Sequence, residues 1–250
     1  MTFFYRPLQI YHVERNQNSL TILIMFRTAL VSLFATALFA TATWGAPTGD
    51  DAKPVSLELF VMSRCPDARR CEALFTDVLK KVTVPVDFAF NYVAKKNETD
   101  QYGATCKHGA IECLGNIQQL CFHEAYPEAD WLRYANCMNA EYESIGREIT
   151  GEALAQKCAI EQEKDFAPIK TCIESGRGEE LHLASIERTV NSNITLSCSV
   201  VINGKLDCII DGGIWKQCQH SNTTTTADDF ANIINSATSD PVPRLRFERV

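Results

Sequence analysis

The first clear hydrophobic pattern predicts a strand, a helix and a second strand. Alternating apolar positions in Val55–Met62 predict a buried strand. A helix is predicted over Asp67–Val82, because its apolar side chains recur at helical spacing and Pro66 suits a first helical turn. Val84–Val93 is again apolar enough for a strand. Elements in this order predict a parallel pair of strands joined by a right-handed crossover.

After a polar loop, a long cysteine-bearing region has helical periodicity. The predicted helices are Gly109–Tyr126, Asp130–Tyr142, Gly151–Glu163, Phe166–Glu174 and Glu179–Thr189. A hairpin is predicted next, because Ser199–Ile202 and Lys205–Ile210 flank the turn Asn203-Gly204. A last helix over Ala227–Ser236 precedes a flexible tail at 238–250. This order predicts an α/β fold over residues 55–237, with a thioredoxin-like central sheet and a cysteine-rich helical insertion at about 106–175.

The N-terminal segment predicts export. Thr28–Ala42 is uncharged, follows Arg27 and ends in an Ala-x-Ala cleavage pattern, so we interpret residues 1–42 as a signal peptide. Met25 would begin a leader of ordinary length, so residues 1–24 are interpreted either as an upstream extension or as the result of a mis-called start. Residues 43–54 then form a linker. The alternative is an uncleaved anchor, although the apolar run is short for a transmembrane helix.

Composition narrows the class of protein. Of the 250 residues 46% are hydrophobic, which excludes wholesale disorder, and a formal charge of −7 argues against a general nucleic-acid binder. There are eleven cysteines, and because this number is odd, an oxidising compartment would leave one sulfur unpaired. Sequons at Asn97, Asn193 and Asn222 agree with a glycosylated luminal protein.

The candidate chemistry lies where the first predicted strand meets the first predicted helix. Cys65 directly precedes Pro66 at the helix start, where unpaired backbone N–H groups and the positive end of the helix dipole favour a thiolate. Arg64, Arg69 and Arg70 add positive potential. A thiolate is the species that attacks a disulfide, so this position suits thiol–disulfide exchange. The alternative is that Cys65 forms half of a structural disulfide.

The second cysteine of a Cys-x-x-Cys site is missing. Its position is occupied by Ala68, and the next cysteine is Cys71. Six helical residues correspond to roughly 9 Å of rise and 240° of rotation, so Cys65 and Cys71 should point apart. A disulfide needs Cα atoms within about 7 Å. We therefore expect Cys71 on the buried face of the helix, as a core thiol or a structural half-cystine.

A second cluster lies at residues 106–121, which read Cys-Lys-His-Gly-Ala-Ile-Glu-Cys-Leu-Gly-Asn-Ile-Gln-Gln-Leu-Cys. This segment resembles the signature of the gamma-interferon-inducible lysosomal thiol reductase family, C-Q-H-G-x2-E-C-x2-N-x4-C. The matching residues are Cys106, His108, Gly109, Glu112, Cys113, Asn116 and Cys121. Only Lys107 departs from the pattern, in place of Gln. The resemblance covers residues 55 to about 205, including the turn Cys65-Pro66 and later cysteines. Within the signature, the cysteines and His108 can equally be structural.

The resemblance implies a divergent member of that family, with a thioredoxin-like fold and a luminal enzyme that reduces protein disulfides in acidic compartments. It implies Cys65 as the nucleophile and a location in the lysosome, a vacuole or outside the cell. Aligning the hairpin on the family places Cys198 where thioredoxin folds carry the cis-proline that faces the nucleophile. Cys198, Cys71 after local rearrangement, or an external small thiol would then resolve the mixed disulfide. Cys198 can equally form a disulfide with Cys208 or another distant cysteine.

Two alternatives from other classes remain open. One is a non-catalytic secreted protein that binds unfolded or cysteine-bearing chains, with its sulfurs locked in disulfides. The other is a metal site at Cys106, His108, Cys113 and Cys121, which lacks the tight spacing of zinc sites. No phosphate-binding loop or dinucleotide fingerprint occurs, so no cofactor is expected. The expected partners are disulfide-containing proteins and a small thiol reductant, with neither nucleic acid nor stable membrane insertion.

Overall fold

A computed structural model describes residues 53–127, 130–219 and 225–237. The predicted signal peptide, most of the predicted linker, the sequon at Asn222 and the predicted tail lie outside these ranges. Among the described helices, none combines the length and the apolar character that a membrane crossing requires.

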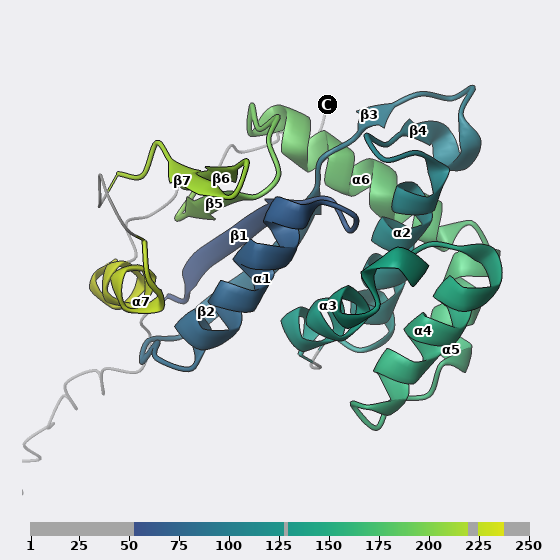
Figure 1. Ribbon diagram of the computed structural model, residues 1–250, viewed down its shortest axis with the longest axis horizontal. Helices are drawn as coiled ribbons and strands as arrows, with labels where there is room; N and C mark the ends of the chain where they lie inside the picture. The colour runs from purple at the N-terminus through teal and green to yellow at the C-terminus, as the bar shows by residue number, and fades with distance from the viewer. Residues whose placement is uncertain (1–52, 128–129, 220–224, 238–250) are drawn as a thin grey trace, which may run out of the picture. The chain divides into compact units, whose positions relative to one another are not determined.

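A five-stranded mixed sheet forms the centre of the described unit, in the order β2-β1-β5-β6-β7 (Figure 1). The strands are β1 (Val55–Val61), β2 (Val86–Tyr92), β5 (Ser199–Ile202), β6 (Lys205–Asp211) and β7 (Ile214–Lys216). β1 runs parallel to β2 and antiparallel to β5. This topology confirms the predicted βαβ unit, the hairpin and the thioredoxin-like arrangement. β7 was not predicted, because three residues are too short to show a hydrophobic period.

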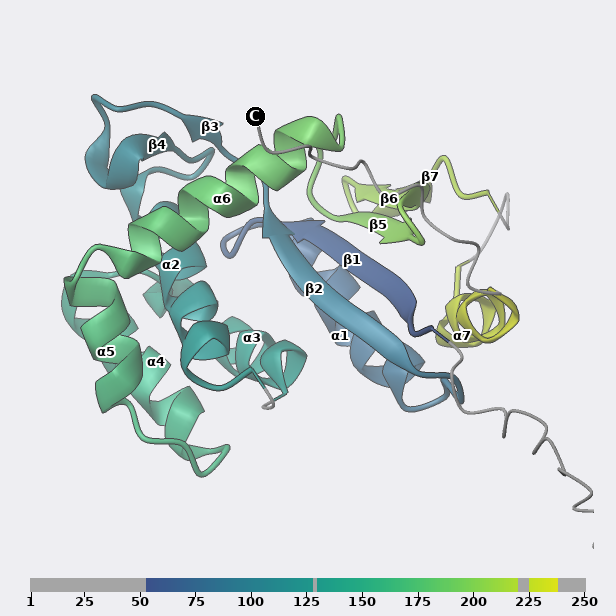
Figure 2. The same ribbon diagram turned by 180° about the vertical axis from the view of Figure 1, so that it is seen from behind.

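Helices cover both faces of the sheet. On one face, α1 (Pro66–Leu79) lies beside α7 (Ala227–Ser236), and the rings of Phe75 and Phe230 are 4.8 Å apart (Figure 1). On the other face, α6 (Arg177–Asn191) crosses β2 (Figure 2). Its Thr189 hydroxyl donates to the Tyr92 carbonyl at 3.0 Å. The two layers enclose a core in which β1 is almost completely buried.

The chain between β2 and α6 forms the helical insertion. Its elements are β3 (Lys95–Lys96), η1 (Gln101–Gly103), β4 (Ala104–Thr105), α2 (Ala110–Ala125), α3 (Trp131–Ala140), η2 (Tyr142–Ser144), α4 (Glu148–Ile160) and α5 (Ala167–Glu174). α2 contacts α3, α4, α5 and α6, so it is the central helix of this region. Two disulfides tie the insertion together, Cys121–Cys172 between α2 and α5 and Cys137–Cys158 between α3 and α4.

The start of α4 differs from the sequence-based prediction. The pair Thr150-Gly151 reads as a turn, yet α4 begins at Glu148 and runs through Gly151. A Cβ atom on Gly151 would lie 2.7 Å from the Ser144 carbonyl oxygen. Glycine is therefore required here by the close approach of α4 to the η2 segment, and not by a turn.

Candidate active site

Cys65 is the free cysteine of the protein. All eleven cysteines lie within the described residues, and the other ten form five disulfides. Cys65 is the N-cap of α1, with extended backbone angles (φ −94°, ψ 125°), and Pro66 begins the helix. Its residue exposure is 7%, so the thiol lies just beneath the surface. A free thiol thus sits at the unpaired N–H groups of a helix start.

Cys65 faces the segment that enters β5. Its Sγ lies 3.6 Å from the carbonyl oxygen of Ser197, the residue before Cys198. The sheet register explains this proximity, because Phe60 near the end of β1 is opposite Ser199 at the start of the antiparallel β5. The residues after β1 and the residues before β5 therefore lie at the same end of the sheet. The Ser197–Cys198 peptide bond is cis.

Cys198 is bonded to Cys71, with a Cα–Cα distance of 6.3 Å. Cys71 is fully buried in α1, which confirms the expected half-cystine on the buried face of the helix, and Cys65 lies at the N-cap. Both side chains contact the segment Ser197–Cys198, Cys65 through the Ser197 carbonyl and Cys71 through its disulfide. Cys198 is therefore not a free thiol in this state. A role in resolving a mixed disulfide at Cys65 is open to Cys71 or Cys198 only after their disulfide is opened. Ala68 is buried and supplies no second sulfur.

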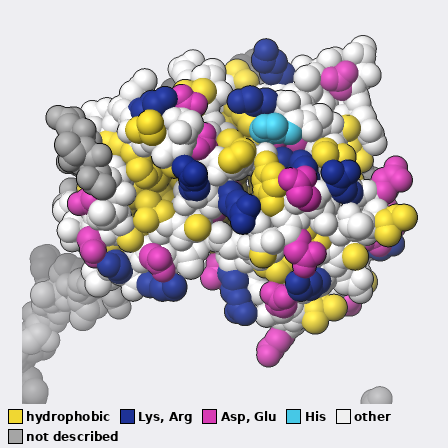
Figure 3. All heavy atoms as spheres, viewed as in Figure 1, with side chains coloured by type: hydrophobic (Ala, Val, Ile, Leu, Met, Phe, Trp, Pro, Cys, Tyr) yellow, Lys and Arg dark blue, Asp and Glu magenta, His cyan; other side chains and the backbone are white. Residues whose placement is uncertain are grey.

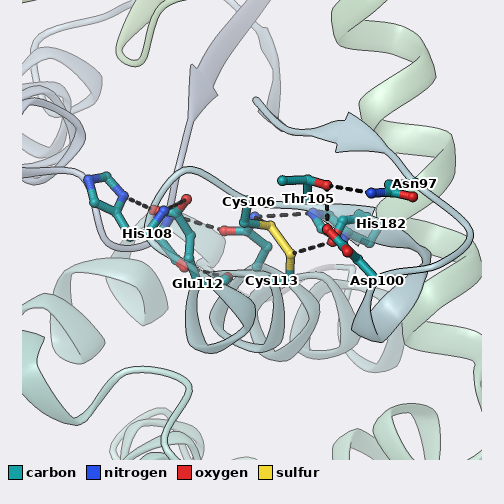
Figure 4. Close-up of a disulfide and its surroundings, with 11 residues drawn as sticks. Asn97, Asp100, Thr105, Cys106, His108, Glu112, Cys113 and His182 are labelled. Carbon is teal, nitrogen blue, oxygen red and sulfur yellow. Dashed lines mark hydrogen bonds and ion pairs between the residues drawn. A yellow bond between two sulfur atoms is a disulfide. The ribbon is translucent and has the colours of Figure 1, made fainter.

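The signature residues form a cluster at the N-terminus of α2 (Figure 4). The Cys106–Cys113 disulfide closes a short loop in which Gly109 has φ +82°, a conformation that favours glycine. The carboxylate of the fully buried Glu112 accepts from the His108 backbone N–H at 3.2 Å and contacts the His108 ring Nδ1. These contacts fix the loop that begins the helix.

The same cluster holds the turn that carries Cys65. The Asn116 Oδ1 accepts from the Ser63 backbone N–H at 2.9 Å, and the Ser63 hydroxyl donates to the Glu112 carbonyl at 3.1 Å. A Cβ on Gly115 would lie 2.5 Å from the Ser63 Oγ, so this close approach requires glycine. Residues of the signature thus hold the turn that carries Cys65 through their contacts with Ser63. Sequence reasoning missed Ser63 and Gly115, which no motif marks.

Asn116 also joins α2 to a buried histidine of α6. With Oδ1 accepting from Ser63, the Asn116 Nδ2 is left to donate, and it lies 3.1 Å from the Nε2 of His182. Burial lowers the pKa of His182 to about 4. His182 is therefore neutral over most of the pH range, with Nε2 as an acceptor.

Arg64 anchors the turn to the insertion. This buried guanidinium donates to the carbonyls of Tyr142 at 3.1 Å and Ile145 at 2.8 Å, and its Cζ lies 5.2 Å from the Tyr142 ring centroid. The Tyr142 hydroxyl donates back to the Arg64 carbonyl. Arg69 and Arg70, in contrast, are exposed. In Figure 3, basic side chains gather at the middle of the face that carries α1.

The remaining predicted residues have structural positions. Cys121 links α2 to α5 through its disulfide with Cys172. Lys107, which stands where the signature has Gln, is exposed, so packing does not restrict the side chain at this position. The three cysteines of the alternative metal site are all in disulfides, which removes the thiolate ligands it requires. Of the two described sequons, Asn193 is exposed, and the Asn97 amide donates to the Thr105 hydroxyl at 3.1 Å.

The chain is similar to a known protein family and to several solved structures. The family model described as "Gamma interferon inducible lysosomal thiol reductase (GILT)" matches residues 56–162. A search of curated proteins gave no match. Among solved structures, oxidised BdbD from Bacillus subtilis is similar at 17% identity and a TM-score of 0.48, covering 74% of this chain and 87% of its own. DsbA from Chlamydia trachomatis is similar at 14% identity and a TM-score of 0.49, with the same two coverages.

Proposed function

We propose that the chain, whose residues 56–162 match the gamma interferon inducible lysosomal thiol reductase (GILT) family model, is a thiol–disulfide oxidoreductase that reduces disulfides of unfolded or partly folded proteins through a thiolate at Cys65. The observation that carries the proposal is the state of the sulfurs. Ten cysteines are bonded to one another, and the one left free is at the start of α1. A thiolate is stabilised at such a position by the helix dipole.

The first step is nucleophilic attack. The Cys65 thiolate attacks one sulfur of a substrate disulfide, which forms a mixed disulfide and breaks the substrate S–S bond. The departing substrate sulfur leaves as a thiolate and takes a proton from solvent. The segment at Ser197, 3.6 Å from the Cys65 Sγ, forms the opposite wall of this site.

The second step releases the substrate. While Cys71 and Cys198 remain bonded, no internal thiol is present at the site, so an external small thiol attacks the Cys65 sulfur of the mixed disulfide and expels the substrate thiolate. A second small thiol then attacks the sulfur of the first, forms the small-molecule disulfide and restores the Cys65 thiolate. Once the Cys71–Cys198 disulfide has been reduced, Cys198 can serve as the resolving thiol, because it follows Ser197, whose carbonyl oxygen contacts the Cys65 Sγ. Cys71 would follow after rearrangement of α1.

The experiment that tests the function is Cys65→Ser, assayed for reduction of a denatured disulfide-containing protein in the presence of a small thiol. We expect turnover to fall to the uncatalysed rate. A Cys71→Ser/Cys198→Ser double variant is the matched control, since it removes two sulfurs beside the site but keeps the nucleophile, and it should retain turnover driven by the external thiol. Unchanged turnover in Cys65→Ser would exclude this site.

Thiol titration separates the enzyme from a non-catalytic protein that binds unfolded chains. One reactive thiol per chain, lost in Cys65→Ser, supports the enzyme. No titratable thiol in the native protein would support the binding protein instead.

We further propose that the chain works in the lumen of the secretory pathway, in a lysosome or vacuole or outside the cell. The leader pattern in residues 1–42 supports this, as does the exposed sequon at Asn193. A change in electrophoretic mobility on glycosidase treatment, lost in Asn193→Gln, checks that this sequon carries a glycan.

A further inference from the structure

A cleft of about 440 Å³ lies against the first two turns of α1, lined by Pro66, Arg69, Arg70, Ala73 and Tyr142. It adjoins the nucleophile in two ways. Pro66 is the residue after Cys65, and the Tyr142 hydroxyl donates to the carbonyl of Arg64, the residue before it. Clefts of this size accommodate small organic molecules.

The cleft is positively charged. Within the described part of the chain, no carboxylate lies at ion-pair distance from Arg69 or Arg70. Arg69 lies with its Cζ 5.9 Å from the Tyr142 ring centroid, and Arg70 donates to the Gly213 carbonyl at 3.5 Å.

Two acidic residues that neighbour the cleft lining in sequence, Asp67 and Glu143, have partners outside the cleft. Asp67 accepts from the backbone N–H groups of Gly212 and Gly213 at 2.8 and 2.7 Å. Glu143 lies 3.4 Å from Arg64. Two exposed guanidinium groups therefore remain to receive an anion, and guanidinium groups bind carboxylates well.

We propose that this cleft binds the carboxylate of a small thiol, which is the reductant that releases the mixed disulfide at Cys65. The inference rests on the proposed function. Ala68 provides no sulfur, and Cys71 and Cys198 are buried and bonded to each other, so the second step draws on a thiol from outside. A cationic cleft with an apolar floor beside the sulfur fits a molecule that carries both a carboxylate and a thiol.

The chemistry balances with two molecules of this thiol. The first, as a thiolate, attacks the Cys65 sulfur, forms a disulfide with it and expels the substrate thiolate. The second attacks the sulfur of the first, forms the small-molecule disulfide and restores the Cys65 thiolate. The two protons of the small thiols end on the two substrate thiols, and the two electrons come from the small thiols.

The test uses three reductants that differ in charge: 3-mercaptopropionate, 2-mercaptoethanol and cysteamine. The wild-type protein is compared with Arg69→Gln/Arg70→Gln. The matched control is Lys80→Gln/Lys81→Gln, which removes the same charge at the other end of α1, where Lys80 and Lys81 form surface ion pairs with Asp77 and Asp228. Reductant KM is measured for each thiol with one denatured protein substrate.

We expect the arginine variant to raise the KM for 3-mercaptopropionate about tenfold, the effect of losing one charge-assisted hydrogen bond, and to leave the KM values of the other two thiols nearly unchanged. Dividing the KM of the variant by the KM of the wild type for each thiol removes the differences in intrinsic reactivity among the three thiols. A weaker thiolate at Cys65 would instead change all three thiols alike. The lysine control should show no charge-dependent change.

Equal KM ratios for the three thiols would overturn the proposal. A raised KM for the protein substrate in place of the small thiol would also overturn it, because the cleft would then bind an acidic side chain of the substrate.

A second measurement needs no turnover and separates this inference from the proposed function. Mass spectrometry follows how fast Cys65 forms a mixed disulfide with dithiodipropionate, hydroxyethyl disulfide or cystamine. Faster modification by dithiodipropionate, lost in the arginine variant, supports the cleft even if reductase activity is absent. No preference among the three disulfides contradicts it even if activity is present.

Discussion

Two helices begin beside the turn that carries Cys65, and their first turns are built in different ways. α1 starts at a free thiol, with no side-chain cap at Cys65. α2 starts inside the closed Cys106–Cys113 loop, with Glu112 holding His108 and Asn116 holding Ser63. The comparison teaches that the Cys65 sulfur is left without a covalent partner, while a disulfide and hydrogen bonds fix the residues around it. Rigid surroundings keep a nucleophile in its productive geometry.

The two regions also differ in the buried ionisable group that each contains. On the α1 side, Glu72 is 1% exposed and its carboxylate accepts from the Asn139 side chain. On the α2 side, His182 is completely buried against Asn116. Burial disfavours the charged form of both groups, so one is a neutral acid and the other a neutral base. Their effects on stability with pH have opposite signs.

The largest expected effect concerns Glu72. Burial raises its pKa to about 8, against the opposing hydrogen bond from Asn139, so the folded state keeps a proton that the unfolded state loses above pH 4.5. The contribution of Glu72 to the free energy of unfolding is complete below pH 4.5 and is lost as pH rises to about 8, by up to roughly 5 kcal/mol. Glu72→Gln keeps the acceptor and removes this loss. Urea denaturation should show that Glu72→Gln has a higher free energy of unfolding than the wild type at pH 8 and not at pH 5. An equal change in the free energy of unfolding at the two pH values would contradict this account.

His182 gives the next effect, in the opposite direction. Its pKa is lowered by burial to about 4, so between pH 6.5 and 4 the unfolded state binds a proton that the folded state does not. The contribution of His182 to the free energy of unfolding is complete above pH 6.5 and declines as pH falls, by roughly 3 kcal/mol at pH 4. The free energy of unfolding of His182→Gln, measured by denaturation between pH 6.5 and pH 4, should not show this decline. A parallel curve for wild type and variant would show that His182 does not titrate in this way.

The changes of stability with pH that Glu72 and His182 cause cancel in the pH range where both groups contribute. Between about pH 4.5 and 6.5, each group contributes a change of one proton with opposite sign, so together they leave stability nearly flat. Above that range the loss from Glu72 remains, and below it the loss from His182 remains. The described pair therefore favours stability in a mildly acidic range.

The smallest effect tests whether the two helix starts differ in role. Cys106→Ala/Cys113→Ala opens the loop before α2, which should lower the free energy of unfolding by roughly 2.5 kcal/mol, because a short loop is no longer closed in the unfolded chain. Turnover at Cys65 should be largely kept at 25 °C. Loss of turnover without loss of stability would give the signature disulfide a chemical role and break the contrast with α1.

Much of the fold could be predicted, because long periodic segments carry a strong signal. α7 was predicted to the residue, and β1, α1 and β2 within a few residues. β3 and β4 were missed, since strands of two residues have no period. Disulfide partners were not predictable, because the partners of Cys71 and Cys121 are brought close only by the tertiary fold.

The candidate site was predictable only in part. Cys65 could be chosen because it alone combines a strand end with a helix start. Glu72 was missed, although a signal existed: it lies on the same helical face as Ala68 and Phe75, at four and three residues' distance. His182 and Ser63 gave no signal, since their roles depend on Asn116, which reaches them from a distant part of the chain.

The order in which the disulfides enclose one another has a topological consequence. Cys71–Cys198 spans the whole insertion, and Cys106–Cys113 and Cys121–Cys172 lie inside it. Cys137–Cys158 lies inside Cys121–Cys172, while Cys208–Cys218 is separate. No two of these links interlace. Any inner link can therefore open and re-form without rethreading the chain, and the outermost link keeps α1 joined to the start of β5 while it does so.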